Sequence, residues 1–434
     1  MTISRALWIA AIAGGLALRL YLVLQPPLVT PDSLTRYEPI ARNLAAGHGF
    51  SRAAAPPYAP DGFNQPGYPL FLAAIYLAAG EDRRAVVLAQ FGLELLTVFL
   101  ILQLARRAGL KPPARAAVGA LALLCPVLPM IARAIWTESL ATTALTAAVL
   151  AWVVAFGGGG RASWTLAGAC SAACLLIRSD MAPVVVLLVV LAAALSLSRS
   201  CFGRFTLAVV ALAVVLAPWI ARNAVELGGL RPLSNPRLLT GSYTTWLDTW
   251  VDDLSQLEPY WWHVVETAPP AAFPPDKVID PGERARAEAA LAQARAAHTL
   301  GVDPVPQIFA ELTAKARRER PFRTFVLVPF RRVVSTWTNV AGYAQNPWAR
   351  AAWISFLLSA LAGACWGLRH KTDITLLLLA TILGRSLLPL RFGIGVEPRY
   401  VVEALPAAFL FAGFLLQAGR FGSAMPKEEP SPPS

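Results

Sequence analysis

The sequence predicts an all-α polytopic membrane protein with about ten transmembrane helices and two long outer loops. Of its 434 residues, 56% are hydrophobic and only 15% are charged, whereas soluble domains carry about 25% charged residues. Apolar runs such as 206–220 and 372–390 approach the ~20 residues that a helix needs to cross the hydrocarbon core. A water-soluble surface over the whole chain is therefore excluded.

The candidate spans follow from the apolar runs in chain order. They cover residues 6–24, 84–104, 116–131, 140–156, 164–177, 183–197, 205–220, 351–366, 372–390 and 400–416. The first run lacks a small-x-small cleavage signal and is expected to stay as a helix. Two shorter runs, 68–79 and 325–340, are expected to be interfacial or re-entrant helices.

Basic residues at the ends of the spans predict the orientation. The net charge of +12 is not gathered in one patch, so no nucleic-acid partner is expected. The short loops on one face carry Arg106, Arg107, Lys111, Arg115, Arg161, Arg199, Arg204, Arg369 and Lys371. Such residues accumulate on the cytoplasmic side, so both termini are expected in the cytoplasm. The membrane is expected to be the inner membrane of a bacterium. The two long loops then face the periplasm.

The same pattern divides the chain. Residues 1–221 form an N-terminal transmembrane module that includes the first outer loop, 25–83. A periplasmic loop, 222–350, is followed by C-terminal helices at 351–419 and a disordered cytoplasmic tail at 420–434. The aromatic stretch in the second loop, including Tyr243, Trp246 and Trp250, suits the lipid headgroup level. Residues 282–299, rich in Ala, Arg and Glu, predict an exposed helix.

Asp32 is the first candidate for chemistry, because it follows the first span within a few residues. A carboxylate held at the lipid boundary can be desolvated and used as a general base. The alternative is structural, since Pro31-Asp32-Ser33 is also a plausible helix start with Asp32 as the N-cap. The residues around Asp32 leave both roles open.

Four motifs in order along the chain resemble the GT-C class of membrane glycosyltransferases. The similarity is to bacterial relatives of protein O-mannosyltransferases and to the aminoarabinose transferase that modifies lipid A. The motifs are Asp32 to Tyr37 with Ala41-Arg42-Asn43-Leu44 and Gln65-Pro66-Gly67-Tyr68-Pro69-Leu70, then Thr137-Glu138-Ser139-Leu140, Ala217-Pro218-Trp219-Ile220-Ala221-Arg222-Asn223, and Pro398-Arg399-Tyr400. The second outer loop carries no such motif.

The resemblance implies an enzyme that moves a sugar from a polyprenyl-phosphate carrier to a hydroxyl acceptor, usually with inversion. Asp32 would be the base, and cations would receive the departing phosphate. Arg222 and Arg399 are assigned to the phosphate, and Arg178 and Arg391 are secondary candidates. For each arginine the alternative is snorkelling to lipid headgroups. Tyr37, Asn223 and Tyr400 are expected to contribute to substrate binding.

The resemblance implies that Glu138 corresponds to an acidic residue that many relatives carry there and that sometimes helps to bind a metal or the acceptor. Its alternative role is a helix-start carboxylate that complements the helix dipole. The chain has Asp32-Ser33 where protein O-mannosyltransferases have two adjacent acids, which leaves the acceptor open among lipid, glycan and protein hydroxyls. Clustered His and Asp ligands are missing from the sequence, so no obligatory cofactor and no metal site are predicted, although a divalent metal remains compatible with the family.

Membrane lipids and the lipid-linked donor are thus the expected partners. The runner-up function is a transporter or flippase for a lipid-linked substrate, which the same arginines near the membrane would serve. That function predicts ionisable residues at mid-span and helices broken by Gly or Pro. The central parts of the candidate spans are nearly free of charge, which favours the transferase.

Overall fold

Helices make up nearly all of the regular structure in the computed structural model. The structure describes residues 2–229, 233, 241–253, 272–300, 303–339, 346–390 and 398–418. Within these ranges seven helical segments are long and apolar enough to cross a membrane. They contain α4 (Arg83–Arg107), α7 (Glu138–Phe156), α9 (Ala182–Ser198), α10 (Phe202–Leu227), α16 (Pro347–His370), α17 (Thr372–Ser386) and α18 (Leu405–Ala418).

Further helices complete the bundle. α1 (Thr2–Leu24), α5 (Pro112–Leu124) and α8 (Arg161–Ile177) pack among the long helices, with α1 against α5 and α8 against both α7 and α10. An all-helical polytopic architecture is therefore confirmed, whereas the expected count of ten spans is not. The expected span 116–131 is divided into α5 and α6 (Val127–Ala132), because Pro126 has no N–H to continue the helix and Cys125 is extended.

The ends of the last two spans that face the long loops are irregular. α17 stops at Ser386 and is followed by a short 3₁₀ turn, η7 (Leu388–Leu390). α18 is preceded by a longer 3₁₀ segment, η9 (Pro398–Ala404). The expected spans 372–390 and 400–416 are thus helical, and each has a 3₁₀ segment at the end near the long loops. Because tighter winding re-aims side chains, this end can turn charged groups inward.

Glycines let several helices approach closely. A Cβ on Gly168 would lie 1.9 Å from the carbonyl oxygen of Ala208, and one on Gly363 would lie 1.7 Å from that of Phe411. These contacts join α8 to α10 and α16 to α18. Small residues at such contacts are the usual way in which helices associate in lipid, where burial of apolar surface contributes little.

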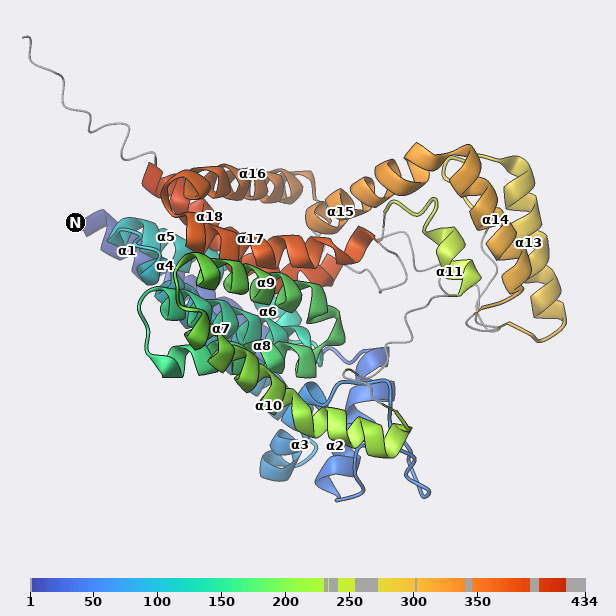
Figure 1. Cartoon of the computed structure of the whole chain (residues 1–434), viewed down its shortest axis with the longest axis horizontal. Coiled ribbons are helices and arrows are strands. Elements are labelled where there is room, and N and C mark those ends of the chain that lie inside the picture. The colour runs from blue at the N-terminus through green and yellow to red at the C-terminus, as the bar shows by residue number, and fades with distance from the viewer. Residues whose placement is uncertain are drawn as a thin grey trace, which may run out of the picture.

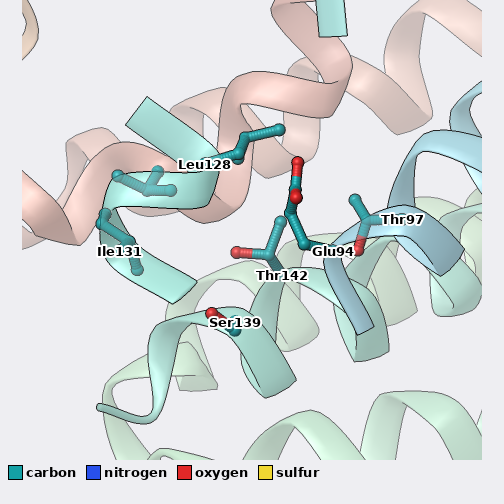
Figure 2. A pocket seen from close by; sticks show the side chains of 7 residues that line it. Glu94, Thr97, Leu128, Ile131, Ser139 and Thr142 are labelled. Atoms are coloured by element: carbon teal, nitrogen blue, oxygen red, sulfur yellow. The ribbon is translucent and has the colours of Figure 1, made fainter. Parts of the chain in front are cut away.

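A buried ion pair joins the first span to α4. Arg19 pairs with Glu94 and also donates to the carbonyls of Gly15 (2.7 Å) and Leu123 (2.9 Å). Beside Glu94 is a cavity of about 10 Å³ (Figure 2), lined also by Thr97, Ser139, Thr142, Leu128, Ile131 and Val402. The size is that of a single water molecule. Because Arg19 pairs with it, the charge of Glu94 inside the bundle is compensated.

The first outer loop folds into short helices against the bundle. A π-helical turn, η1 (Ser33–Tyr37), leads into α2 (Glu38–Ala45), and α3 (Gly67–Ala79) follows. α2 packs on α3, and Gly67 lies against Leu176 and Ile177 at the end of α8. The short apolar segment expected at 68–79 is thus α3, which has 13 residues and is too short to span.

The second outer loop contains a small helical unit of its own. Its helices are α11 (Ser242–Leu247), α13 (Pro281–Ala296), α14 (Pro306–Glu319), the π-helical turn η5 (Arg323–Leu327) and α15 (Val328–Thr338). α13 and α14 stand apart from the bundle, and α15 leads back towards it (Figure 1). The segment expected at 325–340 therefore corresponds to the end of η5 and α15.

Two expectations for this loop are corrected. Tyr243, Trp246 and Trp250 do not face lipid headgroups, because they are at most 3% exposed and form a core with Phe273 and Phe309. The helix expected at 282–299 is α13, and one side of it is buried. Its buried residues are Glu283, Ala287, Ala290, Leu291 and Ala294. The aromatic residues thus build a compact core within this loop. Tyr260, Trp261 and Trp262 lie outside the described residues.

The helix ends sort into two faces. The connections that carry Arg106 to Arg115, Arg161, Arg199 with Arg204, and Arg369 with Lys371 all lie at the end of the bundle where α1 begins. The opposite end receives both long loops (Figure 1). The expected alternation of basic loops and long loops therefore agrees with the arrangement of the helices.

Candidate active site

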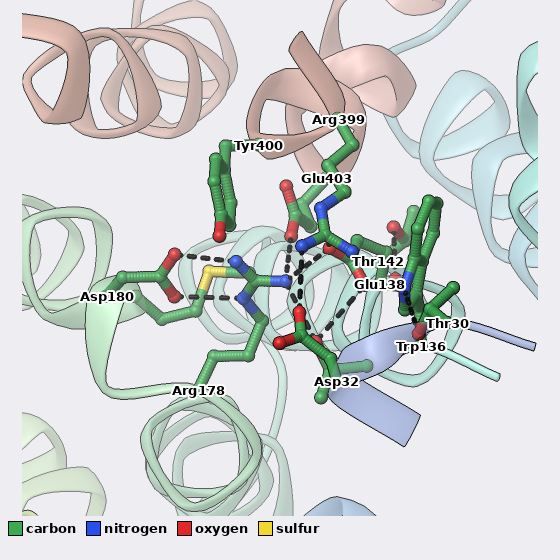
Figure 3. Close-up of polar contacts among 12 residues, drawn as sticks. Thr30, Asp32, Trp136, Glu138, Thr142, Arg178, Asp180, Arg399, Tyr400 and Glu403 are labelled. Carbon is green, nitrogen blue, oxygen red and sulfur yellow. Dashed lines mark hydrogen bonds and ion pairs between the residues drawn. The ribbon is translucent and has the colours of Figure 1, made fainter. Parts of the chain in front are cut away.

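Charged side chains gather at the end of the bundle that receives the long loops. They come from η1 and the residue before it, the start of α7, the junction of α8 with η2 (Ser179–Met181), the end of α17, and η9. Figure 3 shows Asp32, Glu138, Arg178, Asp180, Arg399 and Glu403 among them. We call this set the charge network. Its members are Asp32, Arg36, Glu138, Arg178, Asp180, Arg385, Arg399 and Glu403.

Asp32 does not cap a helix with its side chain. It precedes η1, and its carboxylate accepts no hydrogen bond from the first turn. Thr30 and Ser33 bond to each other's backbone N–H groups instead. The Asp32 carboxylate lies 3.1 Å from Arg36 Nη1 and 3.1 Å from Arg399 Nη2, with its side chain 25% exposed. It is therefore an accessible carboxylate between two guanidinium groups.

Glu138 occupies the first turn of α7 and is buried. Its Oε1 lies 2.8 Å from Arg178 Nη1 and 3.4 Å from Arg399 Nε. The side chain is 2% exposed, so specific cations, rather than only the helix dipole, compensate its charge. Arg399 thus bridges Glu138 and Asp32, which are separated by more than 100 residues in the chain.

Arg178 is the centre of the buried part of the network. Besides Glu138, its guanidinium pairs with Asp180 at 2.7 Å and donates to Thr137 Oγ1 at 2.8 Å. It also lies over the ring of Tyr400, 4.7 Å from the centroid. Such a planar cation can hold several acceptors in a fixed geometry. Arg178 therefore orients groups from α7, η2 and η9 relative to each other.

Arg385, Asp180 and Glu403 were not among the candidates from the sequence. Arg385 is fully buried, donates to the carbonyl of Tyr400 at 2.6 Å, and pairs with Glu403 (3.2 Å) and Asp180 (3.5 Å). Glu403 also lies 3.7 Å from Arg178. Arg385 and Glu403 fall inside the apolar runs 372–390 and 400–416. Ionisable residues within such runs are the signal that could have identified them.

Aromatic rings support the exposed part of the network. The guanidinium of Arg399 lies 4.1 Å from the centroid of Trp136 and 5.4 Å from that of Tyr400. Trp136 is held in turn by its Nε1, which donates to Thr30 Oγ1 at 2.9 Å. Cation–π contacts of this kind fix a guanidinium without using its hydrogen-bond donors. Aromatic rings therefore position the guanidinium of Arg399 in addition to the carboxylates that contact its nitrogen atoms.

Tyr37 lies close to the network on η1. Its ring makes an edge contact with Tyr68 at 5.2 Å. Burial, and then the negative charges of Asp32 and Glu138, raise the pKa of Tyr37 above its ordinary value. The phenol therefore keeps its proton at neutral pH and is available as a hydrogen-bond donor.

The described contacts of Arg222 are with the first loop and Asn223 and not with Arg399, and its assignment to the phosphate stays a prediction. Arg222 donates to the carbonyls of Asp61 (2.8 Å) and Phe50 (3.3 Å) and to Asn223 Oδ1 (3.0 Å). It lines a groove of about 430 Å³ with residues of the first loop and α10, including His48, Tyr58, Trp219 and Glu226. Its described contacts thus tie the first loop to α10.

Two further expectations concern metal binding and Arg391. Within the described residues, no group of three or more His, Cys, Asp or Glu side chains is arranged to hold a metal ion. The acids of the network instead face arginines, four acids to four arginines. Arg391, a secondary candidate for the phosphate, lies outside the described residues.

The partly exposed carboxylate of Asp32 lies beside the guanidinium of Arg399, next to the buried members of the charge network. The carboxylate can accept a proton, and the guanidinium can stabilise an anion in the same place. The buried ion pairs of the charge network hold Asp32 and Arg399 in place, because each buried charge has an opposite charge beside it. Such a pair of groups can combine proton abstraction with stabilisation of a departing anion.

Comparisons with known proteins agree with the sequence motifs. Residues 60–221 match the profile of a family described as dolichyl-phosphate-mannose-protein mannosyltransferase. The matched segment includes Glu138 and Arg178, and the resemblance to GT-C enzymes is confirmed for it. No curated protein matches the chain at a significant level.

Two solved structures are similar to the chain over 96% of its length. One is ArnT from Cupriavidus metallidurans bound to undecaprenyl phosphate, with 16% sequence identity, a TM-score of 0.46 and 78% of that chain covered. The other is ArnT from the same organism in the apo state, with 17% identity, a TM-score of 0.41 and 77% covered.

Proposed function

We propose that this protein transfers a sugar from a polyprenyl-phosphate carrier to a hydroxyl group of an acceptor at the outer face of a bacterial inner membrane. The observation that carries the proposal is the contact of Asp32 with Arg399. Their side chains are 3.1 Å apart at the end of the bundle that receives the long loops. A family defined by a lipid-phosphate-linked sugar matches residues 60–221, which supports the class of donor.

In the proposed reaction, Asp32 accepts the proton of the acceptor hydroxyl as its oxygen attacks the anomeric carbon. The bond between that carbon and the phosphate oxygen breaks, and the polyprenyl phosphate departs with the electron pair. Attack from the face opposite the leaving group inverts the anomeric carbon. A phosphate leaves without needing a proton, so the enzyme supplies a base at one side and positive charge at the other.

Arg399 is the residue that we assign to the departing phosphate. Its guanidinium is near the surface, with its side chain 10% exposed, and already lies beside the carboxylate base. Charge that develops on the phosphate can be stabilised by this guanidinium. Arg178 is a positioning residue, because it pairs with Glu138, which also contacts Arg399. Tyr37 and Tyr400 are assigned to substrate contacts.

Arg399 has two roles that compete in this proposal. In the structure it pairs with Asp32 and Glu138. A donor phosphate would draw the guanidinium towards itself and weaken the contact with Asp32. The carboxylate would then be freer to accept a proton, so donor binding would precede deprotonation of the acceptor.

The test is the variant Asp32→Asn in the full-length protein, with insertion and thermal stability checked first. Glu81→Gln is the matched control, because Glu81 is an exposed acid of the same loop that pairs with Arg42. The assay measures release of undecaprenyl phosphate from synthetic undecaprenyl-phosphate mannose, glucose and aminoarabinose, with a membrane extract as the acceptor source.

We expect Asp32→Asn to abolish release and Glu81→Gln to leave it unchanged. Full activity of a correctly inserted Asp32→Asn variant would remove Asp32 as the base. Failure of the unaltered protein to cleave any of the three donors, together with movement of the intact lipid across proteoliposomes, would favour the transporter instead.

A further inference from the structure

Two arginines contact the Asp32 carboxylate, one at each oxygen. Arg36 Nη1 lies 3.1 Å from Oδ1, and Arg399 Nη2 lies 3.1 Å from Oδ2. The Arg36 side chain is 39% exposed, whereas that of Arg399 is 10% exposed. An exposed ion pair contributes little to the stability of a fold. The contact of Arg36 with Asp32 therefore matters mainly for the carboxylate itself.

Arg36 and Asp32 belong to one helical segment, which keeps them together. Asp32 has helical backbone angles and leads directly into η1, and residues four apart on a helix are neighbours on its surface. The hydrogen bonds between Thr30 and Ser33 anchor the start of the segment. The contact of Tyr37 with a ring of α3 anchors its end. Arg36 is thus carried by a backbone that is held on both sides.

An aromatic ring supports Arg36 as well. Its guanidinium lies 4.9 Å from the ring centroid of Phe63. Phe63 is held in turn, because its backbone N–H donates to Asp61 Oδ1 at 3.0 Å. A cation–π contact leaves the N–H donors of the guanidinium available for a carboxylate. The described contacts of Arg36 therefore all lie within the first outer loop.

Arg399 is anchored by other elements. Its guanidinium contacts Glu138 at 3.4 Å and lies near the rings of Trp136 and Tyr400. Since Arg399 belongs to η9, its movement towards a donor phosphate would not draw Arg36 along. Asp32 Oδ1 would stay paired with Arg36, and Oδ2 would lose its cation.

We infer that Arg36 is a positioning residue, which holds Asp32 by Oδ1 and leaves Oδ2 as the oxygen that accepts the proton of the acceptor hydroxyl. The carboxylate keeps one orientation while Arg399 is engaged with the phosphate. Orientation matters because a small displacement of a reacting group lowers the rate strongly. This inference rests on the proposed function, since it assigns a role within the same reaction.

The kinetic test compares Arg36→Gln, Arg36→Lys and the control Arg42→Gln in full-length protein in nanodiscs, with the donor that the unaltered protein cleaves. Arg42 is a matched control, because it is 40% exposed and pairs with Glu38 at the same spacing of four residues. Glu38 keeps Arg83 as a partner when Arg42 is replaced. The thermal stability of each variant is measured alongside.

The expected results separate orientation of the base from binding of the donor. Arg36→Gln should lower kcat about 10-fold or more and leave the KM of the donor unchanged. Arg36→Lys should retain most of kcat, because an ammonium group suffices to contact a single carboxylate oxygen. Arg42→Gln should behave as the unaltered protein.

A second measurement does not need turnover. A water-soluble carbodiimide together with glycine ethyl ester converts an accessible carboxyl group into an amide, and mass spectrometry of peptides locates the modification at Asp32. We expect labelling of Asp32 to be several-fold faster in Arg36→Gln than in Arg42→Gln, because the carboxylate loses the guanidinium at Oδ1.

Several results would overturn the inference. One is an unchanged kcat in a stable Arg36→Gln variant. A raised KM of the donor at unchanged kcat would assign Arg36 to the phosphate instead. A loss of thermal stability in Arg36→Gln, without recovery of kcat in Arg36→Lys, would make Arg36 a structural residue.

Failure of the proposed function gives a different pattern. The unaltered protein would then cleave none of the donors, and the role of Oδ2 in proton transfer would fall with that function. Faster labelling of Asp32 in Arg36→Gln would still support the hold of Arg36 on the carboxylate, whereas equal labelling in the two variants would overturn that hold too.

Discussion

Arg399 lies 3.1 Å from Asp32 and 3.4 Å from Glu138, and so joins residues of the first loop, the start of α7 and the last span in one contact. The separation of Asp32 and Arg399 in sequence is 367 residues. Because one guanidinium serves both carboxylates, the position of the proposed base depends on the fold of the whole bundle. The predictions below begin with this contact.

Replacement of Arg399 is expected to impair turnover even where charge is kept. Arg399→Gln should lower kcat/KM about 100-fold or more, since loss of one preorganised donor to a developing anion costs this much. Arg399→Lys should also be impaired, because an ammonium group cannot bridge two carboxylates with planar geometry. Steady-state kinetics with the donor that the protein cleaves gives the measurement. Equal activity of Arg399→Lys and the unaltered protein would argue against the bridge.

Loss of the Arg385 guanidinium is expected to destabilise the protein. Arg385→Met leaves Glu403 and Asp180 with one cation fewer in a buried place, and breaking a buried pair costs about 3–5 kcal/mol. The double variant Arg385→Met with Glu403→Gln should recover part of the loss. Thermal unfolding in detergent measures both. Arg369→Met, at an exposed span end, is the control, and a similar loss there would contradict the role of the buried pair.

Adding one methyl group should have opposite effects at two glycines. Gly168→Ala places a Cβ 1.9 Å from the carbonyl oxygen of Ala208, and the forced separation of α8 and α10 should cost about 1–3 kcal/mol. Gly92→Ala in α4 meets nothing within 4 Å and should be neutral or stabilising by up to ~1 kcal/mol, because Ala favours helix. The unfolding temperature distinguishes the two. A tolerated Gly168→Ala would show that these helices can separate without cost.

The contact of α13 with α14 should depend on pH at both extremes. The hydrogen bond from Lys315, with help from backbone N–H groups, lowers the pKa of Asp280, and the same bond raises the pKa of Lys315. The carboxylate contribution is therefore complete above the ordinary Asp value of about 3.9 and is lost as pH falls through the lowered pKa. The ammonium contribution is complete below about 10.4 and is lost as pH rises through the raised pKa.

Hydrogen exchange in α13, corrected for the intrinsic pH dependence, measures this window. Lys315→Met should move its acid limit to higher pH, because Asp280 loses the main cause of its lowered pKa. Arg286→Met removes an exposed ion pair with Glu311 between the same helices and should leave the limit in place. An unchanged acid limit in Lys315→Met would show that the backbone N–H groups alone stabilise the carboxylate.

Several features of this protein could be predicted from local sequence. Long apolar runs indicated the helices of the bundle, and basic residues at their ends indicated which connections share a face. Asp32 stood out as a carboxylate next to an apolar run, and the family resemblance pointed to Glu138, Arg178 and Arg399; the structure brings these four together. The matched family segment agrees with the motifs within it.

Other features depended on contacts between distant segments. Arg222 resembled Arg399 in its position at a span end, but its described hydrogen bonds go to the first loop and Asn223. The aromatic residues of the second loop had the composition of a headgroup belt, yet Tyr243, Trp246 and Trp250 are buried against Phe273 and Phe309. Composition does not distinguish an aromatic residue that meets lipid from one that meets other aromatic residues.

The sequence by itself determined that the chain is a helical membrane protein, because hydrophobicity and backbone hydrogen bonding are local requirements that each run must satisfy alone. Only the tertiary structure decided which charges meet. Arg385 and Glu403 lie in separate apolar runs, and their pairing across 3.2 Å depends on how α17 and η9 pack. A buried charge requires a partner, but a sequence does not specify which of the available opposite charges folding will bring beside it.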